Sequence, residues 1–341
     1  MNQIKQDLKA LCRAPGAGGM SAVSKVALEL LTPLVDEVKI DTMGNVLGRR
    51  NAGVPNAPTI MLEAHMDEIG FLVTHIDSAG FVYTAASGGV DRRVLTAQEV
   101  CIHTDGGIVP GVFCSTPPHL SGKDGELPEL SKRGIDVGMT ADEAKVKIPL
   151  GSRVTFADGY CELNENIVSS KALDDRAGMA AILHCMRKLG KKTPVNVVVA
   201  FCVQEELGCR GASPAVYQTK PDQAIVTDVS FALTPDADPN QCGTLGKGVM
   251  IGISPILNQS VTDKLFSLAE ENGIPFQHEV MGGSTGTDAD RISGAVTGVP
   301  CGLLSIPQRY MHTPVEVVDV RDVAAVGDLM AAYLMVGGAA K

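Results

Sequence analysis

Residues 195–208, VNVVVAFCVQEELG, constrain the fold more than any other part of this chain. The segment begins as a run of β-branched and apolar residues, which is typical of a strand covered on both faces. It then reaches two adjacent carboxylates, Glu205 and Glu206. Burying such acids costs free energy unless a positive charge compensates them. Since ligands of open α/β sheets bind beyond strand ends of this kind, we expect a functional site here.

The pattern of apolar and polar residues changes twice along the chain. Residues 1–68 and 161–341 alternate helical patterns with buried strands, as in an α/β domain. Residues 69–160 instead contain short alternating stretches separated by Gly, Pro, Asp and Ser, which predicts a small β-barrel or sandwich. A chain of 341 residues also exceeds the size at which a single core stops growing. We therefore predict an α/β domain interrupted by an inserted β-rich domain.

The overall composition excludes several classes of protein. The chain has 29 basic and 39 acidic residues, a formal net charge of −10, and no basic run with interleaved aromatics, so we expect no nucleic-acid partner. No apolar run approaches the ~20 residues that span a bilayer, and no secretory signal is evident, so we expect no membrane association. The 9 Cys form no CxxC pair, which is typical of a reduced, cytoplasmic protein.

Acidic and His residues recur just past predicted strands or at a predicted helix start. Two His with several carboxylates and no Cys, gathered at one edge of a sheet, form a set of divalent-metal ligands. Such ligands suit Zn²⁺ or Co²⁺, with Mn²⁺ as a further candidate. The residues are His65 and Asp67 after strand 58–63, Asp174 and Asp175 at a helix start, Glu205 and Glu206, Asp228 after strand 224–227, and His312 after strand 302–306.

Charge balance favours two metal ions in this set. Three carboxylates, with Asp174 as the bridge and Glu206 and Asp228 as further ligands, would neutralise two divalent ions together with a bridging hydroxide. One His for each metal, His65 and His312, would complete a nearly symmetric pair. Coordination lowers the pKa of the bound water, so that this hydroxide is available at neutral pH.

Two other acids have predicted roles beside the ligands. Glu205, next to a ligand, is placed to take the proton of the water and pass it to a leaving amine. Asp67 can accept the ring N–H of His65 and fix its orientation. The simpler alternatives are that a His at a strand end is structural and that Asp175 serves only the helix dipole. The Gly-rich loop 282–287 lacks the Lys-Ser/Thr ending of a phosphate-binding loop. We expect the segment 282–290, with Thr287 and Asp288, to line the substrate pocket.

Taken with these residues, the sequence resembles the M42 family of metallo-aminopeptidases, which includes glutamyl and tetrahedral aminopeptidases. The resemblance extends over nearly the whole chain. Some relatives in this family carry the label cellulase, but the absence of Trp and the 4% aromatic content argue against a sugar-binding cleft. The matching stretches are AHMDEIG (64–70), VLTAQ (94–98), PGVFCSTPPHL (110–120), KALDDRAG (171–178), QEELGCRGA (204–212), VTDVS (226–230), GTDAD (286–290) and RYMHTPVE (309–316).

The resemblance implies a peptidase domain with a mixed sheet flanked by helices, and an inserted β-barrel that mediates dimerisation. It implies metal-dependent removal of N-terminal residues from peptides with a free N-terminus, by a metal-activated bridging hydroxide. It also implies dodecamers built from dimers. The same residues carry the roles given above, with Glu205 as general base, Asp67 as orienting acid, and His65, Asp174, Glu206, Asp228 and His312 as ligands.

Two alternatives remain open from the sequence. One is a di-metal amidase or deacylase that acts on N-acyl amino acids or sugars, and that would therefore cleave N-acetylated substrates. The other is a metal-binding assembly protein without catalytic activity. Loss of catalysis usually shows as a replaced ligand or base, whereas this chain retains all five ligands and the base.

Overall fold

The computed structural model describes residues 1–117, 119, 129–190 and 193–339. The end of the stretch 110–120 that carries part of the resemblance lies outside these residues.

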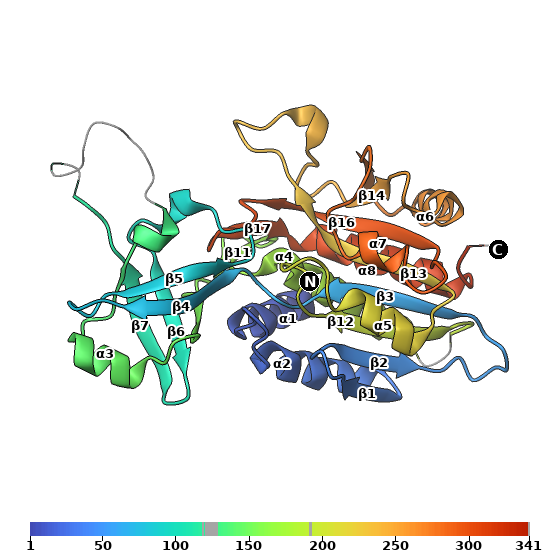
Figure 1. Ribbon diagram of the computed structural model, residues 1–341. Helices are drawn as coiled ribbons and strands as arrows, with labels where there is room; N and C mark the ends of the chain where they lie inside the picture. Colours follow the sequence, from blue (N-terminus) through green and yellow to red (C-terminus); the bar gives the residue numbers. More distant parts are fainter. Residues whose placement is uncertain (118, 120–128, 191–192, 340–341) are drawn as a thin grey trace.

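An 11-stranded mixed sheet forms the centre of the molecule (Figure 1). Its strand order is β1-β2-β12-β3-β13-β16-β17-β11-β10, with β14 beside β16 and β15 beside β14. The pairs β12–β3, β3–β13 and β13–β16 are parallel, whereas β1–β2, β2–β12, β14–β16 and β16–β17 are antiparallel. The strands are β1 (Glu37–Ile40), β2 (Val46–Arg50), β3 (Thr59–His65), β10 (Cys161–Glu162), β11 (Ile167–Ser170), β12 (Asn196–Cys202), β13 (Gln223–Phe231), β14 (Val249–Ile253), β15 (Phe276–Val280), β16 (Cys301–Arg309) and β17 (Glu316–Asp319).

Helices cover both faces of this sheet, as the buried side chains of β12 show. Val197 and Val199 belong to one core, whereas Val198 and Ala200 belong to a second core. Successive side chains of a strand point to opposite faces, so the two cores lie on opposite sides of the sheet. On the first face lie α1 (Asn2–Arg13), α2 (Ala22–Leu31), α4 (Leu173–Lys188), α6 (Gln259–Glu271) and α8 (Val320–Met335); on the second lie α5 (Ala212–Thr219) and α7 (Ala289–Ile292). The predicted mixed sheet flanked by helices is confirmed.

The β-rich segment forms a closed barrel of six antiparallel strands, so the barrel and not the sandwich is the correct alternative. It lies to one side of the sheet in Figure 1. The strand order is β4-β5-β8-β7-β6-β9. The chain enters the barrel just after β3 and returns to the sheet at β10. The elements are β4 (Gly70–Ile76), β5 (Val82–Ser87), η2 (Arg92–Leu95), β6 (Glu99–Thr104), β7 (Gly107–Phe113), η3 (Leu130–Lys132), β8 (Ile135–Asp136), α3 (Ala141–Lys147) and β9 (Arg153–Phe156); η1 (Thr32–Leu34) and η4 (Pro239–Gln241) are short 3₁₀ helices outside it.

Strand β13 differs from the prediction at its end. The sequence places the end of this strand before Asp228, but β13 continues to Phe231, and Asp228 pairs in register with Ser305 of β16. That prediction was wrong because an Asp usually interrupts a strand. Here the Asp228 carboxylate faces the polar site beside His65 while its backbone pairs with β16, so the strand continues.

No helix within the described residues combines the length and the apolar character needed to cross a membrane.

Phe71→Ala tests whether the barrel depends on its aromatic core. The Phe71 ring is fully buried and makes edge contacts with Phe113 and Phe156, at centroid distances of 5.2 and 5.6 Å. Removing the ring should lower the free energy of unfolding by about 3–5 kcal/mol. Urea unfolding followed by circular dichroism measures the change. The control Val146→Ala, at a position 84% exposed, should cost less than about 0.5 kcal/mol; equal losses for both variants would contradict the expectation.

Candidate metal centre

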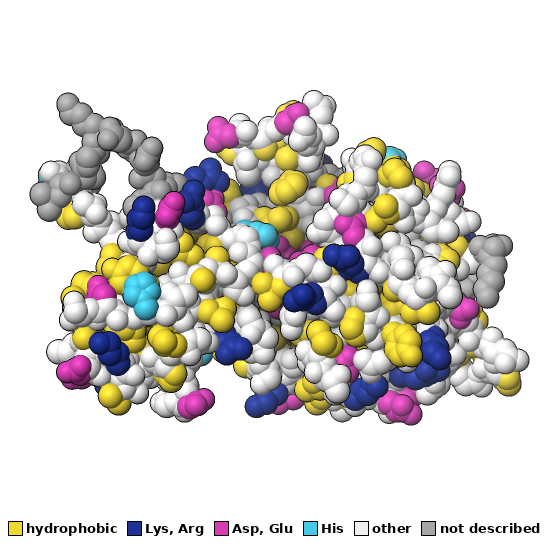
Figure 2. All heavy atoms as spheres, in the orientation of Figure 1, with side chains coloured by type: hydrophobic (Ala, Val, Ile, Leu, Met, Phe, Trp, Pro, Cys, Tyr) yellow, Lys and Arg dark blue, Asp and Glu magenta, His cyan; other side chains and the backbone are white. Residues whose placement is uncertain are grey.

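Strand ends bring the acidic residues and His65 to one edge of the sheet. His65 is the last residue of β3, and β12 ends at Cys202, three residues before Glu205. These strands are parallel to each other, and β3 is parallel to β13, which carries Asp228. Because the carboxyl ends of parallel strands meet at the same edge, side chains far apart in the sequence become neighbours. Figure 2 shows acidic and His side chains in a hollow between the barrel and the sheet.

Backbone contacts hold the turn that carries Glu205 and Glu206. The Asn45 side chain accepts a hydrogen bond from Val203 N (2.9 Å) and donates one to Gly211 O (3.0 Å), so it bridges the two ends of this turn. The Glu205 N–H donates to Asp67 Oδ1 at 3.0 Å, which joins the turn to the end of β3. The fixed backbone therefore determines where both Glu side chains can reach.

Two groups of potential ligands share Asp174. His65 Nε2 lies 2.9 Å from Asp174 Oδ1 and 3.8 Å from Asp228 Oδ1. His312 Nε2 lies 3.3 Å from Asp174 Oδ2 and 3.4 Å from Glu206 Oε1. The donor atoms within each group all lie within 4.8 Å of one another. Asp174 thus offers one oxygen to each group, and the structure brings together all five residues that the sequence singles out as ligands.

This geometry and donor chemistry fit metal ions. Ligand atoms bound tetrahedrally at 2.0–2.2 Å lie about 3.4 Å apart, close to the separations within both groups. Each group combines one imidazole with two carboxylates, a set that suits borderline divalent metals. The three carboxylates of these groups gather negative charge in a partly buried site, and bound cations would balance that charge.

The carboxylates of this site raise the pKa values of the two His residues strongly. Burial opposes the charged form of His312, but Asp174 and Glu206 raise its pKa to about 11. Burial also opposes the charge on His65, yet Asp174 and Asp67 raise its pKa well above the ordinary value. Without cations, protons on the two rings therefore compensate the carboxylates, and metal binding must displace these protons.

The pKa values of the carboxylates shift in opposite directions. Burial would raise the pKa of Asp174, but contacts with His312 and His65 hold it well below its usual range. Burial raises the pKa of Asp228 and of Glu206, since neither acid has enough positive charge beside it. Asp174 is thus the most stable anion of the site, as suits a residue that faces both groups.

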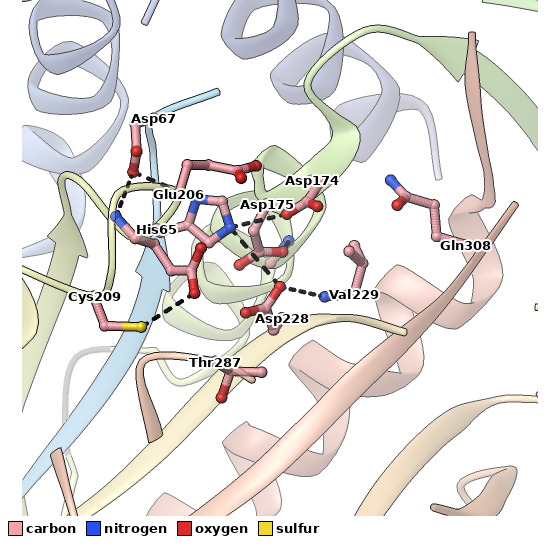
Figure 3. Close-up of polar contacts among 12 residues, drawn as sticks. His65, Asp67, Asp174, Asp175, Glu206, Cys209, Asp228, Val229, Thr287 and Gln308 are labelled. Atoms are coloured by element: carbon pink, nitrogen blue, oxygen red, sulfur yellow. Dashed lines mark hydrogen bonds and ion pairs between the residues drawn. The ribbon is translucent and has the colours of Figure 1, made fainter. Parts of the chain in front are cut away.

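Asp67 and Asp175 lie on opposite sides of the candidate ligands. Asp67 Oδ1 is 3.6 Å from His65 Nδ1, while the other ring nitrogen faces Asp174 and Asp228, so His65 sits between acids on both sides (Figure 3). Asp175 is fully buried and accepts the Gly178 N–H at 2.9 Å, close to the start of α4. Burial raises the pKa of Asp175 well above its ordinary value. Asp67 thus contacts the ring of a candidate ligand, whereas Asp175, the neighbour of Asp174 in the chain, binds the backbone of the first turn of α4.

A cavity of about 350 Å³ opens beside the two groups. Glu205 and Thr287 line it, as do Glu206 and His312. Asp288 does not: it is buried in a separate cluster with Glu63 and Cys202. The expectation that Thr287 and Asp288 line one pocket therefore matches the position of Thr287 only. Asp288 follows Thr287 directly, and its side chain turns into the second core.

Glu316 is a residue of the site that the sequence does not reveal. It is buried, and its carboxylate accepts hydrogen bonds from the backbone N–H of Asp174 (3.1 Å) and of His312 (3.0 Å). One side chain thus fixes the backbone of two candidate ligands. The only signal in the sequence is an acid four residues after His312, within the stretch 309–316.

A buried ionic contact between Glu68 and Lys171 lies next to the segments that carry His65 and Asp174. Glu68 accepts a hydrogen bond from Lys171 Nζ at 2.7 Å and another from Gly16 N at 2.8 Å, and all three are buried or nearly so. It therefore connects the segment after β3, the segment before α4 and the amino-terminal region. The sequence does not predict this role because Lys171, the partner of Glu68, is 103 residues away in the chain.

The backbone is strained next to the candidate ligands. Ala172, Gln204 and His312 have φ values of 57°, 61° and 62°. This left-handed region costs a residue with a side chain of order 1 kcal/mol, and such residues cluster at functional sites. On the barrel side, an added Cβ at Gly89 would lie 3.0 Å from His312 Nδ1, so only Gly allows this loop to approach the ring closely.

Comparison with known proteins identifies the family. The family described as M42 glutamyl aminopeptidase matches residues 44–329. The chain belongs to the M42 family of aminopeptidases. The resemblance seen in the sequence is thus confirmed.

Individual M42 proteins match over nearly their full length. A lysyl aminopeptidase of Pyrococcus furiosus is 34% identical over 323 residues, which cover 93% of this chain and 92% of the relative. An aminopeptidase structure from Desulfurococcus kamchatkensis has a TM-score of 0.91 and 36% identity, covering 98% of this chain and 94% of that one. The TET1 peptidase of Pyrococcus horikoshii has a TM-score of 0.86 and 30% identity, covering 97% and 99%.

The raised pKa values of the two His residues predict how metal affinity of this M42 protein depends on pH. His312, whose pKa is raised to about 11, keeps its proton between pH 6 and 8, and the ion that it binds must displace that proton. The affinity of this site for Zn²⁺ should therefore rise about tenfold per pH unit. Competition with a chromophoric chelator of known proton affinity measures the slope. His184→Gln, which removes a ring paired with Asp328, should keep that slope; an affinity independent of pH would contradict the expectation.

Proposed function

We propose that this protein is a di-metal aminopeptidase that removes N-terminal residues from peptides. The observation that carries the proposal is the sharing of Asp174 between two ligand groups, each completed by one His and one further carboxylate. Membership of the M42 family supports the same reaction.

In this proposal His65 and Asp228 hold one ion, Glu206 and His312 hold the other, and Asp174 binds both. Zn²⁺ or Co²⁺ are the best candidates for these donors, and Mn²⁺ is a third. When bound, the ions lower the pKa of a bridging water and polarise the carbonyl next to the scissile bond. Asp67 fixes the orientation of the His65 ring from its Nδ1 side.

Glu205 is the proposed general base. It lines the cavity but belongs to neither ligand group, so its carboxylate remains available to carry a proton. Burial raises its pKa, which brings it closer to the working pH, where a base is most effective. Its backbone is tied to Asp67, and one carboxylate oxygen accepts the Cys209 thiol at 3.2 Å. These contacts hold the carboxylate at the rim of the ligand groups, where it passes the proton to the departing amine.

The cavity favours a substrate with a free amine. Its lining includes Glu205 and Glu279, two carboxylates outside both ligand groups, and none of the described residues that line it is Lys or Arg. A protonated N-terminus is attracted to such a site, whereas an acetylated N-terminus has no charge to offer. The relative in Pyrococcus furiosus is named a lysyl aminopeptidase, which agrees with peptides as substrates.

We also propose that residues 69–160 form a dimerisation domain and that dimers assemble further, into a dodecamer. The support is a barrel that stands apart from the sheet, and the P. horikoshii relative, which is described as assembling into a tetrahedron or a large octahedral shell.

Glu205→Gln and Glu206→Gln separate the base from a ligand. Glu205→Gln should lower kcat by about 10²–10⁴-fold because the amide cannot take the proton, while two ions remain bound. Glu206→Gln should instead lower metal content. Aminoacyl-p-nitroanilide hydrolysis and metal analysis of the purified variants measure both effects. Full activity in Glu205→Gln would exclude the assigned base.

Substrates with a blocked N-terminus distinguish an aminopeptidase from a deacylase. The protein should cleave Leu-p-nitroanilide and leave N-acetyl-Leu-p-nitroanilide and N-acetyl-leucine intact, and a chelator should abolish the cleavage. Release of acetate from N-acetyl-leucine would instead establish the amidase alternative. If the metal-loaded protein turned over none of these substrates, the assembly protein without catalytic activity would be favoured.

A further inference from the structure

One carboxylate of the cavity has no role in the chemistry described above. Glu279 lies on β15, two strands beyond β16, and it lines the same cavity as the candidate ligands. It accepts a hydrogen bond from Ser305 Oγ at 2.6 Å. Ser305 pairs in register with Asp228 on the next strand. Since neighbouring strands lie about 5 Å apart, the contact with Ser305 holds the Glu279 carboxylate roughly one strand spacing from the strand that carries Asp228.

This carboxylate lacks a cationic partner. No salt bridge joins Glu279 to a Lys or Arg anywhere in the described residues, and Glu279 belongs to neither group of candidate metal ligands. Burial raises the pKa of Glu279, so its environment disfavours an unpaired charge. A partly buried carboxylate without a cation beside it is costly, and a cation entering the cavity would reduce that cost.

The lining of the cavity combines apolar side chains with Ser and Thr residues. Leu303 is buried under the cavity, Met311 is partly exposed, and Phe231 is 61% exposed at its edge. A side chain that reaches from the ligand groups to Glu279 therefore passes along hydrocarbon before it meets a negative charge. Lys and Arg have this distribution, with an apolar stem and a cationic end.

We infer that the cavity selects an N-terminal Lys or Arg, and that Glu279 is the specificity-determining residue that binds the cationic end of that side chain. The inference rests on the proposed aminopeptidase function. An N-terminal Glu would place a second carboxylate beside Glu279, and an N-terminal Leu would bury Glu279 without pairing it. Both substrates are therefore disfavoured relative to Lys and Arg.

Binding of the substrate α-amine by Glu279 is the competing interpretation. The α-amine is separated from the scissile carbonyl by one carbon only, so it must lie near the ions, among Glu205, Glu206 and Asp228. Glu279 is fixed further away by Ser305. The two interpretations differ in what they predict, because every substrate has an α-amine and only Lys and Arg carry the side-chain cation.

The test is a panel of Lys-, Arg-, Leu- and Glu-p-nitroanilides with the metal-loaded protein. The wild type should show kcat/KM for Lys and Arg at least about tenfold above Leu, with Glu the poorest substrate. Glu279→Gln should lower the Lys-to-Leu ratio of kcat/KM by about 10- to 100-fold, since it removes a charge-assisted hydrogen bond. Glu279→Lys should reverse the order and favour Glu. The control Glu271→Gln, at an exposed position on α6, should keep the wild-type ratio.

Inhibition of the wild type gives a second readout that needs no variant. Free lysine should inhibit Leu-p-nitroanilide hydrolysis at least about tenfold more tightly than norleucine, which has the same stem without the charge. An unchanged Lys-to-Leu ratio in Glu279→Gln, or equal inhibition by the two amino acids, would overturn the inference. If either result were found while Leu-p-nitroanilide was still cleaved, the aminopeptidase proposal would remain intact. Absence of cleavage of all four substrates would refute that proposal instead.

Discussion

The crowding of carboxylates around two His rings is the interaction on which the rest of this structure depends. Asp174 faces both rings, and Glu206 and Asp228 lie within ion-pair distance of one ring each. Such a group of acids is unfavourable in a partly buried site unless positive charge balances it. The surrounding fold can be understood as the means of holding these side chains together: parallel strands supply two of them, the start of α4 supplies Asp174, and buried Glu316 fixes the backbone of Asp174 and His312.

The barrel contributes to this site as well as forming a separate unit. Its connection to the sheet begins immediately after His65, and the loop after β5 brings Gly88 and Gly89 against Glu206 and His312. Insertion at this point therefore places a second domain beside the ligands without interrupting the sheet. It also makes the position of His312 sensitive to how the barrel packs, which couples the inserted domain to the proposed metal centre.

The sequence predicts the α/β sheet, the inserted β-rich segment and the grouping of His65, Asp174, Glu206, Asp228 and His312, because strand periodicity and the acids that follow buried strands are local signals. The end of β13 was predicted wrongly since a local rule about Asp ignores what the side chain faces. Glu316 and the contact between Glu68 and Lys171 were missed because their partners are distant in the sequence. Asp288 shows the same limit, as Thr287 lines the cavity whereas the adjacent Asp288 is buried with Glu63 and Cys202.

A crystal structure of the metal-loaded protein, with anomalous scattering recorded at the absorption edge of the bound metal, tests the central claim most directly. It should show two peaks, one within about 2.0–2.2 Å of His65 and Asp228 donor atoms and one within that distance of Glu206 and His312, with Asp174 bound to both. A single ion, or ions bound elsewhere while these five side chains pair only with each other, would contradict the claim that the fold is built around two cations.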